Sequence, residues 1–339
     1  MSEQELKAFV LTNNNGITAT VTNFGGRVVS LFVPDRNGVL GDVVLGYDEL
    51  VSYRTGNPYF GAMIGRYGNR IAKGKFSLNG KTYQLAQNNN GNSLHGGVNG
   101  FHNVIWDVRM LTTGSLEMVY ASKDGDEGFP GNLTVKVIYI LTDNNELMID
   151  YEAHTDQTTV VNLTHHSFFN LAGAGNGDVL DHEVTIFADR FCAVDETLIP
   201  TGELRPVTGT PFDFTRSTKI GKRIDEEYEQ LRFGKGYDHN WVLNKSGNML
   251  ELAARVREPL SGRVMEVYTT EPGLQFYSGN FLDGSDIGKG GRKYPFRSAF
   301  CLEAQHFPDS PNHVDFPSVV LSPSDVYYQK TIYAFSAGD

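Results

Sequence analysis

Short segments in which apolar and polar residues alternate run through the chain, and this period of two predicts β-strands. Residues 17–22 (Ile-Thr-Ala-Thr-Val-Thr) alternate strictly, so one face of this strand is apolar and the other carries threonines. Residues 133–141 and 147–153 are two longer β-rich runs, with Asp143-Asn144-Asn145 between them. Similar runs lie at residues 184–186 and 264–268. The pattern therefore predicts many short strands joined by turns.

A hairpin is the clearest local prediction. Asn79-Gly80 separates residues 76–78 from residues 81–85, which is typical of two strands joined by a two-residue turn. Glycine (37 residues) and further Asn-Gly and Asp-Gly pairs separate the other runs. Many short strands, frequent turns and no βαβ alternation predict an all-β fold, a large antiparallel β-sandwich with few short helices.

Helical periodicity is confined to residues 217–231. The apolar residues there that follow helical spacing are Ile220, Ile224, Tyr228 and Leu231. Gly234 and Gly236 follow and would end the helix. No low-complexity linker, long charge run or repeat of fixed period marks a domain boundary, so residues 1–339 are predicted to form a single domain.

The charge balance limits the partners. The formal net charge is −11, and no basic run interrupts the acidic background. Such a chain is a poor binder of nucleic acid and of anionic membranes and, more weakly, of phosphorylated substrates. The first residues lack the features of a signal peptide, and no apolar stretch approaches the ~20 residues of a membrane span. We expect a cytoplasmic protein whose two cysteines, Cys192 and Cys301, are reduced and buried.

Glu303 is the first candidate for chemistry. It lies in the apolar run Phe300-Cys301-Leu302, which predicts a buried strand, and it shares a strand face with Cys301 and Gln305. An unpaired charge is costly in such a place. A salt-bridged structural carboxylate and a catalytic base fit the position equally well.

His166 is the second candidate. Residues 161–171 surround it with apolar side chains. Adjacent strand residues face opposite ways, so His165 and His166 are not expected to share one site. Alone, His166 resembles a hydrogen-bonded core histidine more than a catalyst, although an imidazole is well suited to proton transfer near neutral pH.

Three further segments could contact a ligand. His95 precedes Gly96-Gly97, where the backbone can approach a ligand closely. Residues 66–70 place two arginines and an asparagine beside a glycine, and residues 236–241 combine an acid, a histidine and an aromatic ring, as sugar sites commonly do. Each segment is also consistent with an ordinary turn.

Cofactor motifs are absent. There is no His-Glu-x-x-His motif and no Cys/His pairing at ligand spacing, which argues against a metal. Gly-x-Gly-x-x-Gly and Walker motifs are missing, and so is the Gly-x-Ser-x-Gly motif of α/β-hydrolases. We therefore expect no metal and no cofactor.

Several segments resemble the galactose mutarotase (aldose 1-epimerase) family, both in their residues and in their order, over nearly the whole chain. The matching segments are residues 57–61, 64–66, 69–72, 93–97, 124–131, 162–171, 194–202, 238–240, 273–277 and 301–303. The resemblance implies the galactose mutarotase-like supersandwich, with an open sugar cleft on one face.

The resemblance also implies a reaction. Glu303 matches the family's general base and His166 its general acid in the ring opening that interconverts the α and β anomers of galactose and glucose. The positions that hold the sugar hydroxyls or tune this pair are matched by Asn69, Arg70, His95, Asp238 and Gln275. The implied partner is a monosaccharide, without nucleic acid or membrane, and the expected state is a monomer or homodimer.

Some positions depart from the family pattern. Phe129 stands where tyrosine is usual, His165 replaces a common asparagine, and His306-Phe307 replaces a common Asn-Trp pair. We expect these changes to affect substrate preference more than the type of reaction.

Three alternatives stay open at this point. A non-catalytic sugar-binding module would keep the hydroxyl contacts but would not need both an acid and a base. A hexose-6-phosphate 1-epimerase would need a cationic pocket, and only Arg66 and Arg70 lie close together near the expected site. A glycosidase would use Asp238 and Glu303 as its carboxylate pair.

Overall fold

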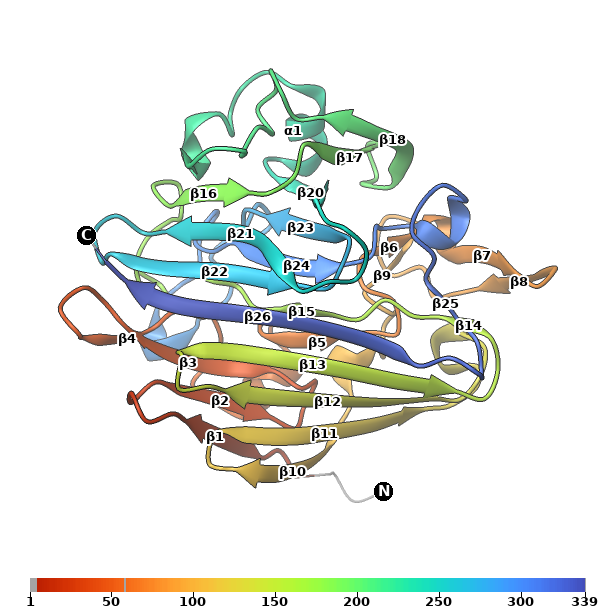
Figure 1. Ribbon diagram of the computed structural model, residues 1–339, viewed down its shortest axis with the longest axis horizontal. Coiled ribbons are helices and arrows are strands. Elements are labelled where there is room, and N and C mark those ends of the chain that lie inside the picture. Colours follow the sequence, from red (N-terminus) through yellow and green to blue (C-terminus); the bar gives the residue numbers. More distant parts are fainter. Residues whose placement is uncertain (1–4, 58, 339) are drawn as a thin grey trace.

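The computed structural model describes residues 5–57 and 59–338. Two parts of the sequence analysed above lie outside these ranges. They are Pro58 of the 57–61 segment and the first four residues, which belong to the stretch that lacks the features of a signal peptide. Within them the fold is built of antiparallel strands in two layers, with a broad nine-stranded sheet in front and smaller sheets behind it (Figure 1).

The nine-stranded sheet forms one layer. Its strands, in spatial order, are β10 (Asp107–Thr112), β11 (Ser115–Ser122), β12 (Leu133–Leu141), β13 (Glu146–Thr155), β26 (Tyr327–Ala337), β22 (Arg263–Thr269), β21 (Glu251–Arg257), β16 (Glu183–Ile186) and β19 (Thr218–Lys219). All neighbouring strands are antiparallel. The C-terminal strand β26 thus lies in the middle of this sheet.

Two sheets make up most of the second layer. The four-stranded sheet has the order β1 (Ala8–Thr12), β2 (Thr18–Thr22), β3 (Val28–Pro34) and β4 (Leu40–Asp42). The five-stranded sheet has the order β18 (Pro200–Pro206), β17 (Arg190–Val194), β20 (Asp238–Val242), β23 (Gly273–Tyr277) and β24 (Cys301–Gln305). Phe169, in the segment after β15, forms isolated β-bridges with Val44, which follows β4, and with Phe300, which precedes β24. These bridges connect the segment to both sheets.

Short elements complete the structure. The two-stranded pairs are β5 (Ala62–Ile64) with β15 (Thr164–His166), β6 (Arg70–Ile71) with β9 (Ser93–Leu94), β7 (Lys75–Leu78) with β8 (Lys81–Gln84), and β14 (Thr159–Val160) with β25 (Val320–Leu321). The α-helix is α1 (Glu229–Gly234), and the 3₁₀ turns are η1 (Leu50–Arg54), η2 (Ala72–Gly74), η3 (Phe101–Asn103), η4 (Asp126–Gly128), η5 (Ile220–Lys222), η6 (Lys289–Gly291) and η7 (Ser310–Asn312). No described helix has the length and apolar character needed to cross a membrane.

The strand predictions are confirmed. The hairpin of β7 and β8 turns at Asn79 (φ 51°) and Gly80 (φ 76°), the left-handed pair of backbone angles that a two-residue Asn-Gly turn requires. The expected runs are found in β2, β12, β13, β16 and β22. The all-β antiparallel sandwich predicted from the sequence is therefore the fold observed.

The predicted helix over residues 217–231 is largely wrong. Ile220, Ile224 and Leu231 are buried in the core, but the segment forms strand β19, the turn η5 and, after a gap, the start of the short helix α1. The backbone N–H groups of Ile220 and Gly221 donate to the carbonyls of His182 and Leu180. Amides committed to a neighbouring segment in this way do not serve a continuous helix.

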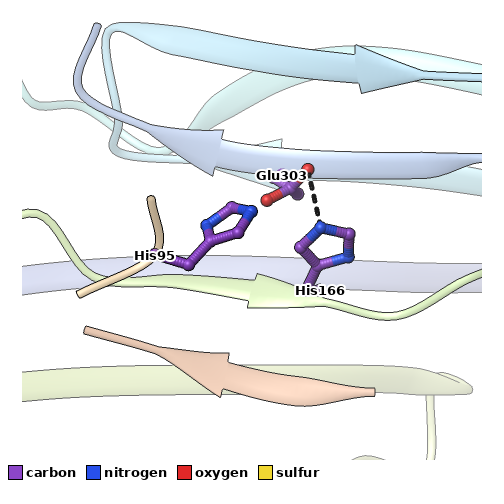
Figure 2. A group of neighbouring side chains, drawn as sticks. All are labelled: His95, His166 and Glu303. Atoms are coloured by element: carbon purple, nitrogen blue, oxygen red, sulfur yellow. Dashed lines mark ion pairs between the residues drawn. The ribbon is translucent and has the colours of Figure 1, made fainter. Parts of the chain in front are cut away.

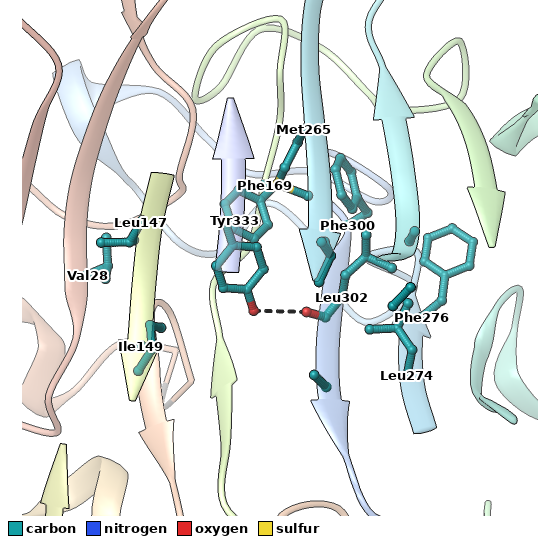
Figure 3. Packing of buried hydrophobic residues seen from close by; sticks show 14 of the residues in the cluster. Val28, Leu147, Ile149, Phe169, Met265, Leu274, Phe276, Phe300, Leu302 and Tyr333 are labelled. Atoms are coloured by element: carbon teal, nitrogen blue, oxygen red, sulfur yellow. Dashed lines mark hydrogen bonds between the residues drawn. The ribbon is translucent and has the colours of Figure 1, made fainter. Parts of the chain in front are cut away.

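The core lies between the two layers. Figure 3 shows Tyr333 of β26 packed beside Phe169, and its hydroxyl donates to the carbonyl of Leu302 on β24 at 3.0 Å. This bond joins the nine-stranded sheet to the five-stranded sheet behind it. Cys192 and Cys301 are both free and buried, as expected.

Candidate active site

The predicted site residues gather around one cavity of about 370 Å³. Of the seven, six line it, and Gln275 does not; those that do are Asn69, Arg70, His95, His166, Asp238 and Glu303. Its other lining residues are Asn57, Tyr59, Asn89, Asn90, Leu94, Phe168, Leu198, Tyr277 and Phe281. A larger hollow of about 1070 Å³ near β3 and β4 holds none of the seven.

Glu303 and His166 meet at this cavity from different sheets. Glu303 is in β24, His166 ends β15, and Glu303 Oε1 lies 3.5 Å from His166 Nε2 (Figure 2). The other polar atom of each, Glu303 Oε2 and His166 Nδ1, is buried and has no hydrogen-bond partner among the described residues. Both side chains line the cavity, so a ligand bound there would contact this pair.

Burial dominates the electrostatics of this pair. It raises the pKa of Glu303 well above its usual value, the Asp238 carboxylate raises it further, and Arg70 opposes both effects. Burial lowers the pKa of His166 to about 3, and Arg27 acts in the same direction. Low dielectric disfavours each charged form, so the neutral arrangement of the pair is favoured when nothing else contacts it.

Asn69 and His95 hold each other by two reciprocal hydrogen bonds. The His95 N–H donates to the Asn69 carbonyl at 3.0 Å, and the Asn69 N–H donates to His95 Nδ1 at 3.1 Å. Both residues have left-handed backbone angles, φ 61° and φ 52°, which are uncommon outside glycine and often occur at functional sites. Burial, with His166 and Arg70, lowers the pKa of His95 well below its usual value. The ring is therefore neutral and carries its proton on Nε2, as a hydrogen-bond donor.

The tautomer of His95 bears on metal binding. Figure 2 shows that His95, His166 and Glu303 converge, and one potential ligand atom from each lies within 4.8 Å of the others. However, a metal at His95 Nε2 would need the proton to move to Nδ1, where the Asn69 N–H already donates. The three residues fit proton transfer better than metal coordination.

Asp238, Gln275 and Arg70 form a second polar group beside the pair. Gln275 Nε2 donates to Asp238 Oδ1 at 2.8 Å, and Arg70 Nη2 lies 4.0 Å from Asp238 Oδ2. Burial raises the pKa of Asp238, while Arg70 and the Gln275 hydrogen bond oppose this. Gln275 thus lies behind Asp238 and acts on the cavity through it. The antiparallel register, with Gln275 opposite both Asn240 and Glu303, fixes this arrangement.

His165 and His166 face opposite sides of β15, as predicted. His165 Nε2 and the Ser167 hydroxyl are 2.7 Å apart, and the His165 ring lies against Tyr139 and Tyr333 of the nine-stranded sheet. His165 is therefore part of the packing between layers.

Arg66 and the departures from the family pattern lie outside the cavity lining. The buried Arg66 guanidinium donates to the Ser122 hydroxyl and to the carbonyls of Lys123, Pro130 and Gly131. Phe129 packs in a buried cluster with Phe76 and Tyr67. His306 pairs with Glu271, and Phe307 packs against Phe316 and Cys192.

The aromatic wall of the cavity was not predicted from the sequence. Tyr59, Phe168 and Tyr277 all line it. A usable signal existed for two of them, since Phe168 and Tyr277 each lie two residues after a predicted site residue and a strand period of two places such pairs on one face. Tyr59 lies within the 57–61 segment, one of those that resemble the family pattern.

Comparisons with known proteins agree with this geometry. The aldose 1-epimerase family model matches residues 7–334. The galactose mutarotases of Sus scrofa and Bos taurus are each 51% identical over 316 residues, which cover 93% of this chain and 90% of the relative. The solved structure of an aldose epimerase homologue from C. elegans superposes with a TM-score of 0.91 at 32% identity, covering 99% of this chain and 100% of that one.

The chain belongs to the aldose 1-epimerase family. This membership makes it an enzyme of the isomerase class, and the mutarotase-like β-sandwich expected from its sequence is confirmed.

Proposed function

We propose that this protein is an aldose 1-epimerase that interconverts the α and β anomers of galactose and glucose, with Glu303 as base and His166 as acid. The observation that carries the proposal is the buried Glu303–His166 pair, 3.5 Å apart, which lines a sugar-sized cavity. The named activities of the relatives agree with it.

The reaction needs two proton transfers. Glu303, as carboxylate, takes the proton of the C1 hydroxyl, so that O1 and C1 form a carbonyl. The C1–O5 bond breaks, its electron pair goes to the ring oxygen, and His166, as imidazolium, protonates O5. After rotation about C1–C2 the ring recloses with the roles reversed. Each positioned proton transfer typically contributes about 10²–10⁴-fold to the rate.

The pair carries one titratable proton at each stage of this cycle, although it is not the same proton. His166 gives its proton to O5 while Glu303 gains the proton of the C1 hydroxyl, so the pair's total charge does not change. Burial favours the neutral arrangement, while a sugar hydroxyl donating to Glu303 would favour the carboxylate and so the imidazolium. A bound sugar would thus shift the pair toward the arrangement that ring opening requires.

The remaining polar groups would hold the sugar. His95 Nε2–H is a fixed donor, Asp238 is an acceptor held by Gln275, and Arg70 lies between Asp238 and Asn69. Each is positioned by hydrogen bonds within the protein, which reduces the entropy lost when a sugar binds.

A pocket for a hexose 6-phosphate is less well supported. Among the described residues that line the cavity, Arg70 is the one lysine or arginine, and it faces Asp238. Arg66, the other candidate, donates to Ser122 and to backbone carbonyls elsewhere. A phosphate would therefore meet more carboxylate than cation in this cavity.

Polarimetry of freshly dissolved α-galactose tests the proposal. The protein should speed the approach to the equilibrium rotation without releasing reducing ends from glycosides. Saturable sugar binding without faster rotation would indicate a binding module, and reducing-end release would indicate a glycosidase. Faster anomerisation of glucose 6-phosphate than of glucose would favour the phosphate alternative.

The organisation of the protein is part of the same proposal. Residues 1–339 are taken as one domain because a single buried cluster draws side chains from all three large sheets. The cytoplasmic location and the monomeric or homodimeric state stay predictions of the sequence.

A further inference from the structure

Tyr59 contacts three histidines, and the proposed reaction assigns it no role. Its ring centroid lies 4.7 Å from that of His95 and 5.1 Å from that of His102, both in edge-on geometry. Its ring centroid lies 5.6 Å from that of His166, and the two rings are nearly parallel, with 20° between their planes. One aromatic ring thus touches the proposed acid and the neighbouring donor His95 together.

Phe168 supplies a second ring parallel to the same imidazole. Its centroid is 4.9 Å from that of His166, again at 20°. Phe168 is itself held edge-on by Phe60 at 4.9 Å and by Tyr277 at 6.0 Å. Both rings stacked on His166 are within the ~6 Å at which an aromatic face attracts a cation.

The surroundings of His166 give this contact a chemical purpose. Burial lowers the pKa of His166 to about 3, and Arg27 repels a second positive charge. Burial lowers the pKa values of His95 and His102, so both rings are neutral and add no charge beside His166. Glu303 at 3.5 Å is the facing anion, but burial raises its pKa and so favours the neutral pair. The imidazolium that ring opening requires therefore needs stabilisation in addition to that from Glu303.

We propose that Tyr59 is a positioning residue of the epimerase site, whose ring, with that of Phe168, fixes the plane of the His166 imidazole and stabilises its protonated form. The aromatic faces attract the imidazolium more than the neutral imidazole, so they favour the carboxylate–imidazolium arrangement of Glu303 and His166 that ring opening requires. This inference rests on the proposed function for its catalytic meaning, while the ring contacts themselves do not.

Three variants separate the ring from other properties of these residues. Tyr59→Leu removes the ring, Tyr59→Phe keeps the ring and removes only the hydroxyl, and Phe168→Leu removes the second ring. The measurements are the pH dependence of kcat by polarimetry and the titration of the His166 imidazole by ¹⁵N NMR, assigned with His166→Asn.

Loss of either ring should lower the pKa of His166 by about half to one unit, as expected for a cation–π contact. The basic limb of kcat should move to lower pH by the same amount in Tyr59→Leu and stay in place in Tyr59→Phe. An unchanged His166 titration in Tyr59→Leu would overturn the proposal, and so would an equal shift in Tyr59→Phe, because the hydroxyl would then be responsible.

The two proposals fail in different experiments. If wild-type protein does not speed the mutarotation of α-galactose, the proposed function fails, while the NMR titration still tests the ring contacts. If Tyr59→Leu does not fold, Phe168→Leu gives the same decision, since its ring is stacked on the same imidazole.

Discussion

His165 and His166 are neighbours on β15, yet each lies 3.5 Å from a partner in a different layer of the protein. His165 Nδ1 is that distance from the hydroxyl of Tyr139 in the nine-stranded sheet. His166 Nε2 is that distance from Glu303 Oε1 in the five-stranded sheet. The alternation of side chains along a strand therefore separates two identical residues into a packing role and a chemical one.

This separation predicts unequal effects of one substitution. His166→Asn should lower kcat by about 10²-fold or more, because the proton donor to the ring oxygen is lost. His165→Asn should leave kcat much closer to wild type and instead lower the free energy of unfolding, because His165 is buried between the sheets. Polarimetry and urea unfolding of both variants provide the check. Equal losses of kcat would contradict the assignment of His166.

Glu303→Gln should keep sugar binding but lower kcat by at least ~10²-fold, because an amide cannot accept the proton of the C1 hydroxyl. Progress curves in the polarimeter and a calorimetric measurement of galactose affinity test the two parts separately. Glu271→Gln is the matched control, since Glu271 is a buried glutamate that contacts His306 and does not line the cavity. A Glu303→Gln enzyme with near-normal kcat would remove Glu303 from the mechanism.

Phe129→Tyr should leave the galactose-to-glucose ratio of kcat/KM unchanged. The departure from the family pattern predicted an effect on substrate preference, but Phe129 packs on Phe76 in a buried cluster and does not line the cavity. Measuring kcat/KM for both sugars in both proteins decides the matter. A changed ratio would mean that this turn communicates with the cavity.

His306 should make stability depend on pH. Burial lowers the pKa of His306, but the Glu271 carboxylate, 2.5 Å from its Nδ1, outweighs this and raises the pKa above the usual ~6.5. A pKa raised by folding means that the stabilisation is fully present below ~6.5 and is lost as pH rises through the folded value. The free energy of unfolding should therefore fall over this interval.

Urea unfolding between pH 6 and pH 9 tests the prediction on His306. In His306→Asn the free energy of unfolding should no longer fall as the pH rises. This variant should also be less stable than wild type at pH 6, because Glu271 is left buried without its partner. His154→Asn, at an exposed position of β13, should keep the wild-type profile. Parallel profiles for wild type and His306→Asn would show that this pair is not the source.

Local structure was predictable where neighbouring residues determine it. Asn79-Gly80 has the backbone freedom that a two-residue turn requires, so the hairpin follows from the sequence alone. The helix predicted over residues 217–231 was wrong because its apolar side chains can be buried in the core without a continuous helix. The backbone hydrogen bonds that replace the helical ones go to Leu180 and His182, which are distant in the sequence.

The site was predictable as a set of residues but not as an arrangement. The family resemblance selected Glu303, His166 and their neighbours, whereas the distance between them depends on how β15 and β24 pack. That Gln275 lies behind Asp238, and that the Arg66 side chain turns to Pro130, follows from strand register and turn geometry across distant segments. No local pattern encodes such relationships.

The central position of β26 has a consequence for synthesis of the chain. β13 and β22, the two strands that it separates, are both made before it, and each exposes an unpaired edge until residues 327–337 emerge. Exposed strand edges template pairing between chains. Slow translation or truncation before β26 should therefore favour aggregation, which makes this strand the segment on which yield of the native protein depends.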